Sequence, residues 1–193
     1  MTSQIRLHGL PLSGHAHKVE VFLRLLGLSF DYVEAGGPAR QTDAFARLNP
    51  LRQIPVLEDG ELVLADSNAI LVYLAKRYDP AGAWLPEDAV GAAQVQRWLS
   101  VSAGEIKFGP ANARAVHLFG YTTNLADAQG VAARLLGLME TTLAAQPWLT
   151  GPRPTLADIA CYPYVACAPE GGWAFTWAAR EGCFAGSMAS RSA

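Results

Sequence analysis

Strand-like alternation occurs only in the first third of the chain, and this uneven distribution limits the fold more than any other feature. Alternating residues or short apolar runs occur in four segments: 5–8, 30–34, 54–58 and 62–64. From about Asp88 onward, apolar residues recur at the spacing of a helix face until an irregular tail. The sequence therefore predicts an α/β unit followed by an all-helical unit.

Helical signals separate the strand-like segments of the first unit. Apolar residues at helical spacing run from Val19 to Leu26, and Gly27 ends them. Residues 43–48 indicate a short helix after a loop with glycine and proline. The dipeptide Asp59-Gly60 favours a tight hairpin turn, and a further helix begins near residue 66. The predicted order is βαβαββα, with the first two strands parallel because a helix joins them.

Two prolines and a glycine interrupt the periodicity between Asp79 and Pro86. We therefore expect a first domain at residues 1–79, a linker at 80–87 and a helical domain at 88–193. Within the helical domain, short polar residues at Asn124 and Thr155 predict two helix starts.

Composition excludes several classes of protein. Of 193 residues, 51% are hydrophobic, and the formal net charge is −2 with no basic stripe, so we expect no nucleic-acid partner. No signal-peptide core or membrane-length apolar run is present, which favours a soluble, cytoplasmic protein without membrane contact. The cysteines, at 161, 167 and 183, are odd in number and fit reduced thiols.

Pro55 has two interpretations. A trans proline at the start of a strand interrupts a ladder at a sheet edge. A cis Ile54-Pro55 bond would instead turn the chain and leave the Ile54 main chain pointing outward, where it could dock an extended peptide. The residues alone favour the first interpretation and leave the second open.

Two helix starts, at Ser13 and at Asp66-Ser67, are equally ambiguous. Short polar residues cap the free amides of a first helical turn. The same amides with a serine hydroxyl can also bind an anion, such as a carboxylate at Ser67 or a thiolate at Ser13. Both interpretations stay open on the residues alone.

Histidines at 8, 15 and 17 do not make a convincing metal site. His15 and His17 are two residues apart on an expected helix and point to different faces, and no cysteine is near in sequence. We therefore expect no metal. The absence of a Cys-x-x-Cys motif also argues against a dithiol redox enzyme.

Three motifs together resemble a known family. Residues 10–14 (LPLSG), 49–60 (NPLRQIPVLEDG) and 64–74 (LADSNAILVYL) are similar to the N-terminal domain of bacterial glutathione transferases. The run 155–160 (TLADIA) resembles the N-capping box of the family's helical domain. The similarity extends from about residue 4 to about residue 170.

The resemblance implies a thioredoxin-like N-terminal domain, an all-helical C-terminal domain and a homodimer that uses glutathione as co-substrate in detoxification. It implies that Ser13 donates to the thiolate, as in serine-type members. Ile54, before a cis Pro55, would bind the cysteinyl backbone, with Gln53 as a weaker contact. Asp66 and Ser67 would hold the amine and the carboxylate of the γ-glutamyl end.

The second substrate would be a small hydrophobic electrophile. Family topology implies a site between the domains, lined by Trp98, Ser102, Lys107 and Phe108. Those four residues have an equally good interpretation as helix core or solvated face. The alternative for the whole protein is a non-catalytic module of the same fold that binds glutathione or another protein.

Two positions depart from the family pattern. His15 stands where many bacterial members have asparagine, so we keep it as a candidate contact to the thiol. From about residue 173 the family pattern is lost, and the tail resembles the end of a truncated or frame-shifted chain. We expect the residues after Gly172 to pack less regularly than a family helix.

Overall fold

The computed structural model describes residues 4–172 and divides the chain into two compact units, residues 1–82 and 83–193. The division falls within the segment 80–87, where the sequence predicted a linker. Each unit has its own core. The prediction for the tail concerns residues 173–193, which lie outside the described residues.

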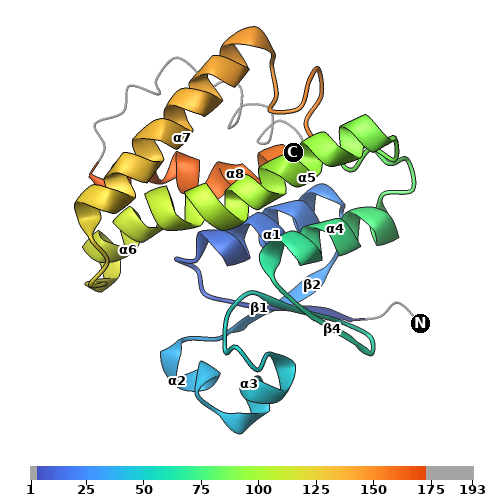
Figure 1. Cartoon of the computed structure of the whole chain (residues 1–193). Helices are drawn as coiled ribbons and strands as arrows, with labels where there is room; N and C mark the ends of the chain where they lie inside the picture. Colours follow the sequence, from blue (N-terminus) through green and yellow to red (C-terminus); the bar gives the residue numbers. More distant parts are fainter. Residues whose placement is uncertain (1–3, 173–193) are drawn as a thin grey trace. The chain divides into compact units, whose positions relative to one another are not determined.

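The first unit is a four-stranded mixed sheet with helices on both faces (Figure 1). Its elements in chain order are β1 (Ile5–Gly9), α1 (Gly14–Leu25), β2 (Phe30–Glu34), α2 (Gly37–Arg40), α3 (Asp43–Leu48), β3 (Val56–Asp59), β4 (Leu62–Ala65) and α4 (Ser67–Tyr78). The strand order is β2-β1-β3-β4; β1 and β2 are parallel, and the other pairs are antiparallel. This confirms the predicted thioredoxin-like order and adds one short helix, α2.

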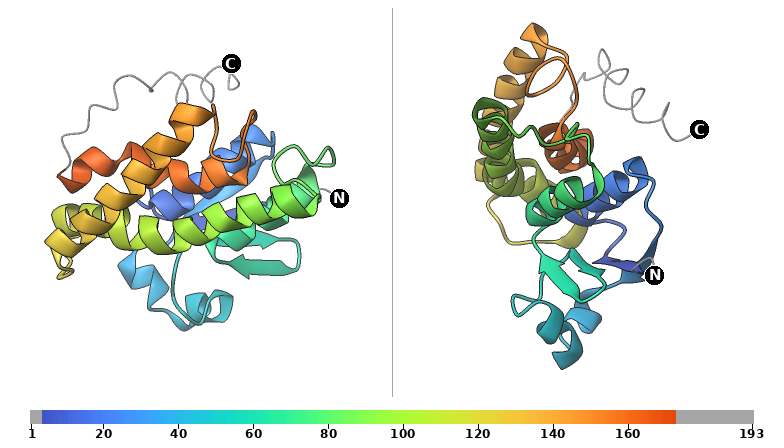
Figure 2. Two further views of the ribbon diagram at one scale, coloured as in Figure 1. Left: turned by 45° about the horizontal axis from the view of Figure 1, so that its top comes forward. Right: turned by 90° about the vertical axis from the view of Figure 1, so that its right-hand side faces the viewer.

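Helices α1 and α4 lie together on one face of this sheet, and α2 and α3 lie on the other, as the views of Figures 1 and 2 agree. Apolar side chains of α1 and α4, such as Phe22, Leu23 and Ile70, are fully buried. On the second face, Phe45 of α3 packs with Val56 of β3. Because both faces are covered, His8 is also buried, although it alternates with the apolar Leu7 along β1.

The hairpin between β3 and β4 turns at Gly60-Glu61, one residue later than the sequence predicted. Asp59 belongs to β3 and pairs with Leu62. Only Gly60 has a positive φ, 62°, which glycine adopts without steric cost. The Asp59 carboxylate accepts hydrogen bonds from the hydroxyls of Tyr73 and Tyr78 on α4.

The regular elements in the described part of the second unit are all helical. It contains α5 (Ala89–Val101), a π-helical stretch η1 (Ser102–Ala111), α6 (Asn112–Phe119), α7 (Leu125–Ala145), α8 (Leu156–Ala166) and a short 3₁₀ turn η2 (Ala168–Gly171). Of these elements α7, with 21 residues, is the longest. No helix among residues 4–172 has the length and apolar character needed to cross a membrane.

The predicted helix starts of the second unit are confirmed. Asn124 caps α7 by accepting from the N–H groups of Ala126 and Asp127. At α8, Thr155 and Asp158 form a capping box. The core packs Trp98 and Ile106 against a stripe of α7 that includes Leu135 and Met139. The π-helical stretch was not predicted, because no local residue pattern distinguishes its wider turns from α-helix.

Candidate functional site

Ser13 is the N-cap of α1. The Ser13 N–H donates to the carbonyl of Leu10 over 2.8 Å, which closes the turn after β1. Its half-buried side chain accepts from the Ala16 N–H, with 3.3 Å between N and Oγ. A hydroxyl has two lone pairs and one proton, so this cap still leaves the Ser13 proton to donate. Capping and thiolate binding are therefore compatible at Ser13.

Gly9 positions this turn at the end of β1. A Cβ atom at Gly9 would lie only 2.8 Å from the Ala16 Cβ and 2.5 Å from the Tyr32 hydroxyl. Such distances are shorter than van der Waals contact, so the start of α1 can pack this closely only against a glycine.

The N-terminus of α4 presents a second set of polar groups. Asp66, the N-cap, has a φ of 73°, a conformation that residues other than glycine rarely adopt. Its Oδ1 accepts from the N–H groups of Asn68 and Ala69, each over 2.9 Å. The first-turn amides of these two residues are thus satisfied within the protein.

Ser67 differs from its neighbours. It is only 6% exposed, yet neither its hydroxyl nor its main-chain N–H has a hydrogen-bond partner among residues 4–172. The Ser67 Oγ is not among the fully buried side-chain atoms that lack a partner, and the first N–H groups of a helix are ordinarily unpaired and carry partial positive charge. Ser67 therefore offers two donors to an anion at the beginning of α4.

The segment 49–55 contributes main-chain groups next to β3. The Ile54–Pro55 bond is cis, the second of the two sequence interpretations. Strand pairing begins only at Val56. Within the part of the chain that the structure describes, the N–H and C=O of Ile54 have no partner. The side chain of Gln53 is exposed, whereas its carbonyl accepts from Asn49.

Buried Lys18 connects the two serine-bearing helix starts, although the sequence analysis did not select it. It is 2% exposed, and its Nζ donates to Oδ1 of Asn68 over 2.6 Å, so it links α1 to the first turn of α4. A signal was present, because Lys18 lies four residues before Phe22 on the apolar face of α1.

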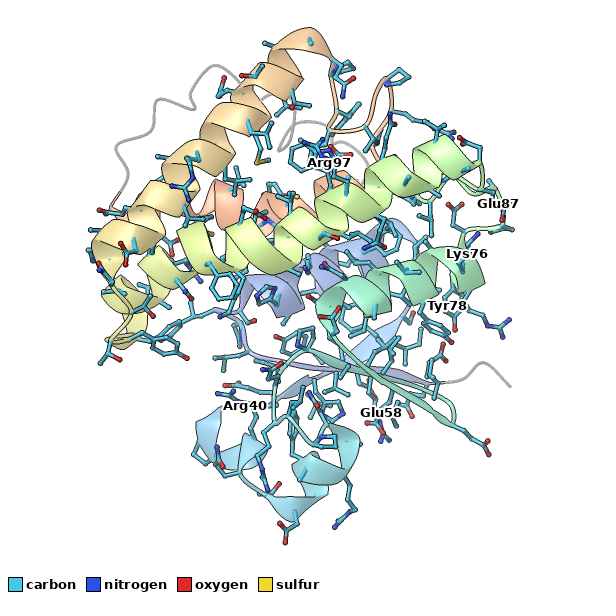
Figure 3. The ribbon with its side chains drawn as sticks, viewed as in Figure 1. Arg40, Glu58, Lys76, Tyr78, Glu87 and Arg97 are labelled. Atoms are coloured by element: carbon cyan, nitrogen blue, oxygen red, sulfur yellow. The ribbon has the colours of Figure 1, made fainter. Side chains whose placement is uncertain are left out.

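Two arginines support the segment from the side of α2 and α3, and these too were missed. Arg52, at a φ of 54°, donates through Nη1 to the carbonyls of Arg40 and Thr42 over 2.9 and 3.0 Å. The Nε of Arg40 is buried without an acceptor in residues 4–172. Figure 3 shows Arg40 on the α2 and α3 side of the sheet.

The three histidines of the first unit lie in different surroundings. His8 pairs with Glu58, with 2.7 Å between Nε2 and Oε1. His15 is half-buried in the first turn of α1, whereas His17 is exposed with Nδ1 at 3.8 Å from Glu20. The described residues include no group of three or more His, Cys, Asp or Glu side chains that could hold a metal ion.

The four candidates for the electrophile site separate into two pairs. Trp98 and Ser102 are buried in the helical core, where Trp98 Nε1 donates to Leu149 over 3.1 Å and Ser102 Oγ donates to Ala160 over 3.0 Å. For these two the core interpretation holds. Lys107 and Phe108 are exposed on η1, with Phe108 60% exposed.

Comparison with known proteins identifies the family. The model for the glutathione S-transferase N-terminal domain matches residues 7–82, and that for the C-terminal domain matches residues 105–166. A maleylpyruvate isomerase from a Ralstonia species is 31% identical over 85% of this chain and 82% of its own length. The chain belongs to the glutathione S-transferase family. The expectation of a glutathione transferase is thereby confirmed at the level of the family.

Other matches agree with this assignment. A crystal structure of a glutathione S-transferase from Xanthobacter autotrophicus Py2 has a TM-score of 0.85 and 31% identity, covering 96% of this chain and 93% of that one. Mouse glutathione S-transferase theta-3 is 37% identical over 46% of this chain. That alignment spans only 38% of the mouse protein.

Proposed function

We propose that this protein is a serine-type glutathione transferase that activates the glutathione thiol for attack on a small hydrophobic electrophile. The observation that carries the proposal is a set of donors and acceptors that have no partner among residues 4–172: the Ser67 hydroxyl and N–H, and the main chain of Ile54. These groups suit an extended peptide that ends in a carboxylate.

In this proposal the main chain of Ile54 pairs with the cysteinyl backbone of glutathione. Ser67 and the positive end of α4 hold the γ-glutamyl carboxylate. Asp66 uses only Oδ1 to cap its helix, so Oδ2 can accept from the γ-glutamyl amine. Gln53, Pro55 and the thiol contact of His15 stay predictions, as do the homodimer and the cytoplasmic location.

Ser13 would donate its proton to the sulfur. A thiol with a pKa near 8.5 is only about 3% thiolate at pH 7, and lowering the pKa by about two units requires about 2.7 kcal/mol. A hydrogen bond to a charged group supplies roughly 1.5–3 kcal/mol, and the N-terminus of α1 adds roughly 0.3–1 kcal/mol. One serine at a helix start is therefore sufficient.

Thiol activation alone gives a modest acceleration. The thiolate fraction rises about 25-fold, while intrinsic nucleophilicity falls about 8-fold at a Brønsted slope near 0.45. The net gain is about threefold, so the larger contribution must come from holding the electrophile beside the sulfur. On the helical unit, Lys107 and Phe108 are the two candidates exposed enough to take part.

Two measurements test the proposed function. Titration calorimetry should detect glutathione binding, and a model electrophile such as 1-chloro-2,4-dinitrobenzene should then be conjugated with glutathione. Binding without turnover would instead assign the non-catalytic alternative. A protein that does not bind glutathione at all would contradict both.

A further inference from the structure

Asn49 is a buried polar residue that the proposed mechanism does not use. It is 5% exposed and follows α3 directly. Its side-chain Nδ2 donates to the Gln53 carbonyl over 2.9 Å, and its Oδ1 accepts from the Leu51 N–H over 3.1 Å. Its carbonyl accepts from the Arg52 N–H over 2.8 Å. These bonds fold the segment 49–53 back onto Asn49.

The hydrogen bond from Asn49 to the Gln53 carbonyl also sets the orientation of the peptide plane between Gln53 and Ile54. The peptide bond between Gln53 and Ile54 is trans, since the single cis bond among the described residues is the next one along the chain. In a planar trans peptide, the C=O and the N–H point in opposite directions. A Gln53 carbonyl held toward Asn49 therefore directs the Ile54 N–H away from Asn49, as a donor without a partner in residues 4–172.

We propose that Asn49 is a positioning residue for glutathione: by donating to the Gln53 carbonyl, it holds the Ile54 N–H in the orientation that binds the cysteinyl carbonyl. The proposal rests on the proposed function and assigns Asn49 no contact with glutathione. A polarised Gln53 carbonyl also makes the N–H of the same peptide a better donor, because hydrogen bonds in a chain strengthen one another. A free peptide plane could rotate and lose this alignment.

The test compares two ligands and three variants by titration calorimetry. The ligands are glutathione and its (E)-alkene isostere at the Cys–Gly bond, which keeps the planar shape and both carboxylates but has neither the cysteinyl carbonyl nor the glycyl N–H. Asn49→Asp keeps an oxygen for Leu51 and removes the donor to Gln53. Asn49→Ala removes both side-chain bonds. Thr42→Val is the matched control, because Thr42 caps α3 through Phe45 in the same connection without touching Gln53.

Wild type should bind glutathione about three- to tenfold more tightly than the isostere, because one neutral hydrogen bond contributes about that much to the binding constant. In both Asn49 variants this ratio should fall close to one. Thr42→Val should keep the wild-type ratio even if its melting temperature falls. A wild-type ratio in the Asn49 variants would overturn the proposal and leave Asn49 as a loop-closing residue.

The remaining outcomes also test the role of Asn49 or the proposed function. A wild type that binds both ligands equally overturns the role of Asn49 while glutathione binding stands, and a wild type that binds neither contradicts the proposed function itself. If the Asn49 variants do not fold, NMR of the wild type replaces them. Glutathione should shift the side-chain amide resonance of Asn49 and the isostere should not; equal shifts overturn the proposal.

Discussion

Helices α4 and α8 begin with similar short polar residues, yet their N-termini are satisfied in opposite ways. At α8, the fully buried Asp158 accepts from the N–H groups of Leu149 and Thr155 over 2.9 and 2.8 Å. At α4, the cap Asp66 is exposed, and Ser67 keeps two donors without partners among residues 4–172. One helix start is closed within the core, and the other is available to a ligand.

The difference teaches which helix starts can bind an anion. The positive end of a helix attracts negative charge in both cases. At α8 that charge comes from the protein, because the Asp158 carboxylate lies inside the core. At α4 the cap uses one carboxylate oxygen, and Ser67 has no partner within the part of the chain that the structure describes. The function of a helix N-terminus therefore depends on what the rest of the chain leaves unpaired there.

The largest expected effect comes from breaking the closed helix start. Asp158→Ala leaves the N–H groups of Leu149 and Thr155 buried without acceptors, at about 1–3 kcal/mol each. We expect the free energy of unfolding to fall by about 2–6 kcal/mol in urea titrations. Asp127→Ala, which removes an exposed carboxylate from the first turn of α7, is the control and should change stability by less than about 0.5 kcal/mol. Equal losses in the two variants would contradict this account.

Asp158 should also make stability depend on pH. Burial raises its pKa above the ordinary value of 3.8, while the hydrogen bonds from Leu149 and Thr155 act in the opposite direction. The folded state therefore keeps the proton at pH values where the unfolded state has released it. The contribution to stability is fully present below pH 3.8 and declines as pH rises through the folded-state pKa. Relative to Asp158→Asn, wild type should become less stable from about pH 3.5 upward in urea titrations.

The sequence predicted both helix starts but not this difference between them. Thr155 and Asp158 have the spacing of a capping box, and Asp66-Ser67 precedes an apolar stripe, so both positions were recognisable. The two helix starts differ in their contacts with residues outside the helix. At α8, for example, the N–H of Leu149 donates to Asp158. Local pattern carries no information about such contacts.

The same limit explains what was missed around segment 49–55. The family motif drew attention to Ile54 and Pro55, whereas Asn49 acts through a hydrogen bond that only the folded segment reveals. Trp98 and Ser102 were selected by position along the chain, and tertiary packing buries both. Fold class and element order were predictable because periodicity encodes them directly.

The third prediction breaks the open helix start. Ser67→Ala should weaken glutathione binding by roughly 1.5–3 kcal/mol, the cost of a lost hydrogen bond to a charged group. Stability should change by less than about 0.5 kcal/mol, because the hydroxyl has no bond within the described residues. Titration calorimetry and thermal melting measure the two effects. Ser100→Ala, at an exposed hydroxyl of α5, is the control and should leave both affinity and stability unchanged. If Ser67→Ala lowers stability without weakening glutathione binding, Ser67 is a structural residue.

The smallest effect is expected at Ser13, the helix start that combines both behaviours by capping α1 and keeping a proton to donate. Ser13→Ala should raise the pKa of the bound glutathione thiol by at least about one unit, which corresponds to the lower limit of about 1.5 kcal/mol for a hydrogen bond to a charged group. Affinity at low pH should hardly change, because the sulfur is then a thiol in both proteins. Thiolate absorbance of the complex against pH measures the shift.

Thr42→Val, which loses a cap in the same unit, should lower stability by about 1 kcal/mol and leave the thiol pKa in place. If Ser13→Ala behaves like Thr42→Val, Ser13 is only a cap, and His15 in the first turn of α1 becomes the candidate donor to test.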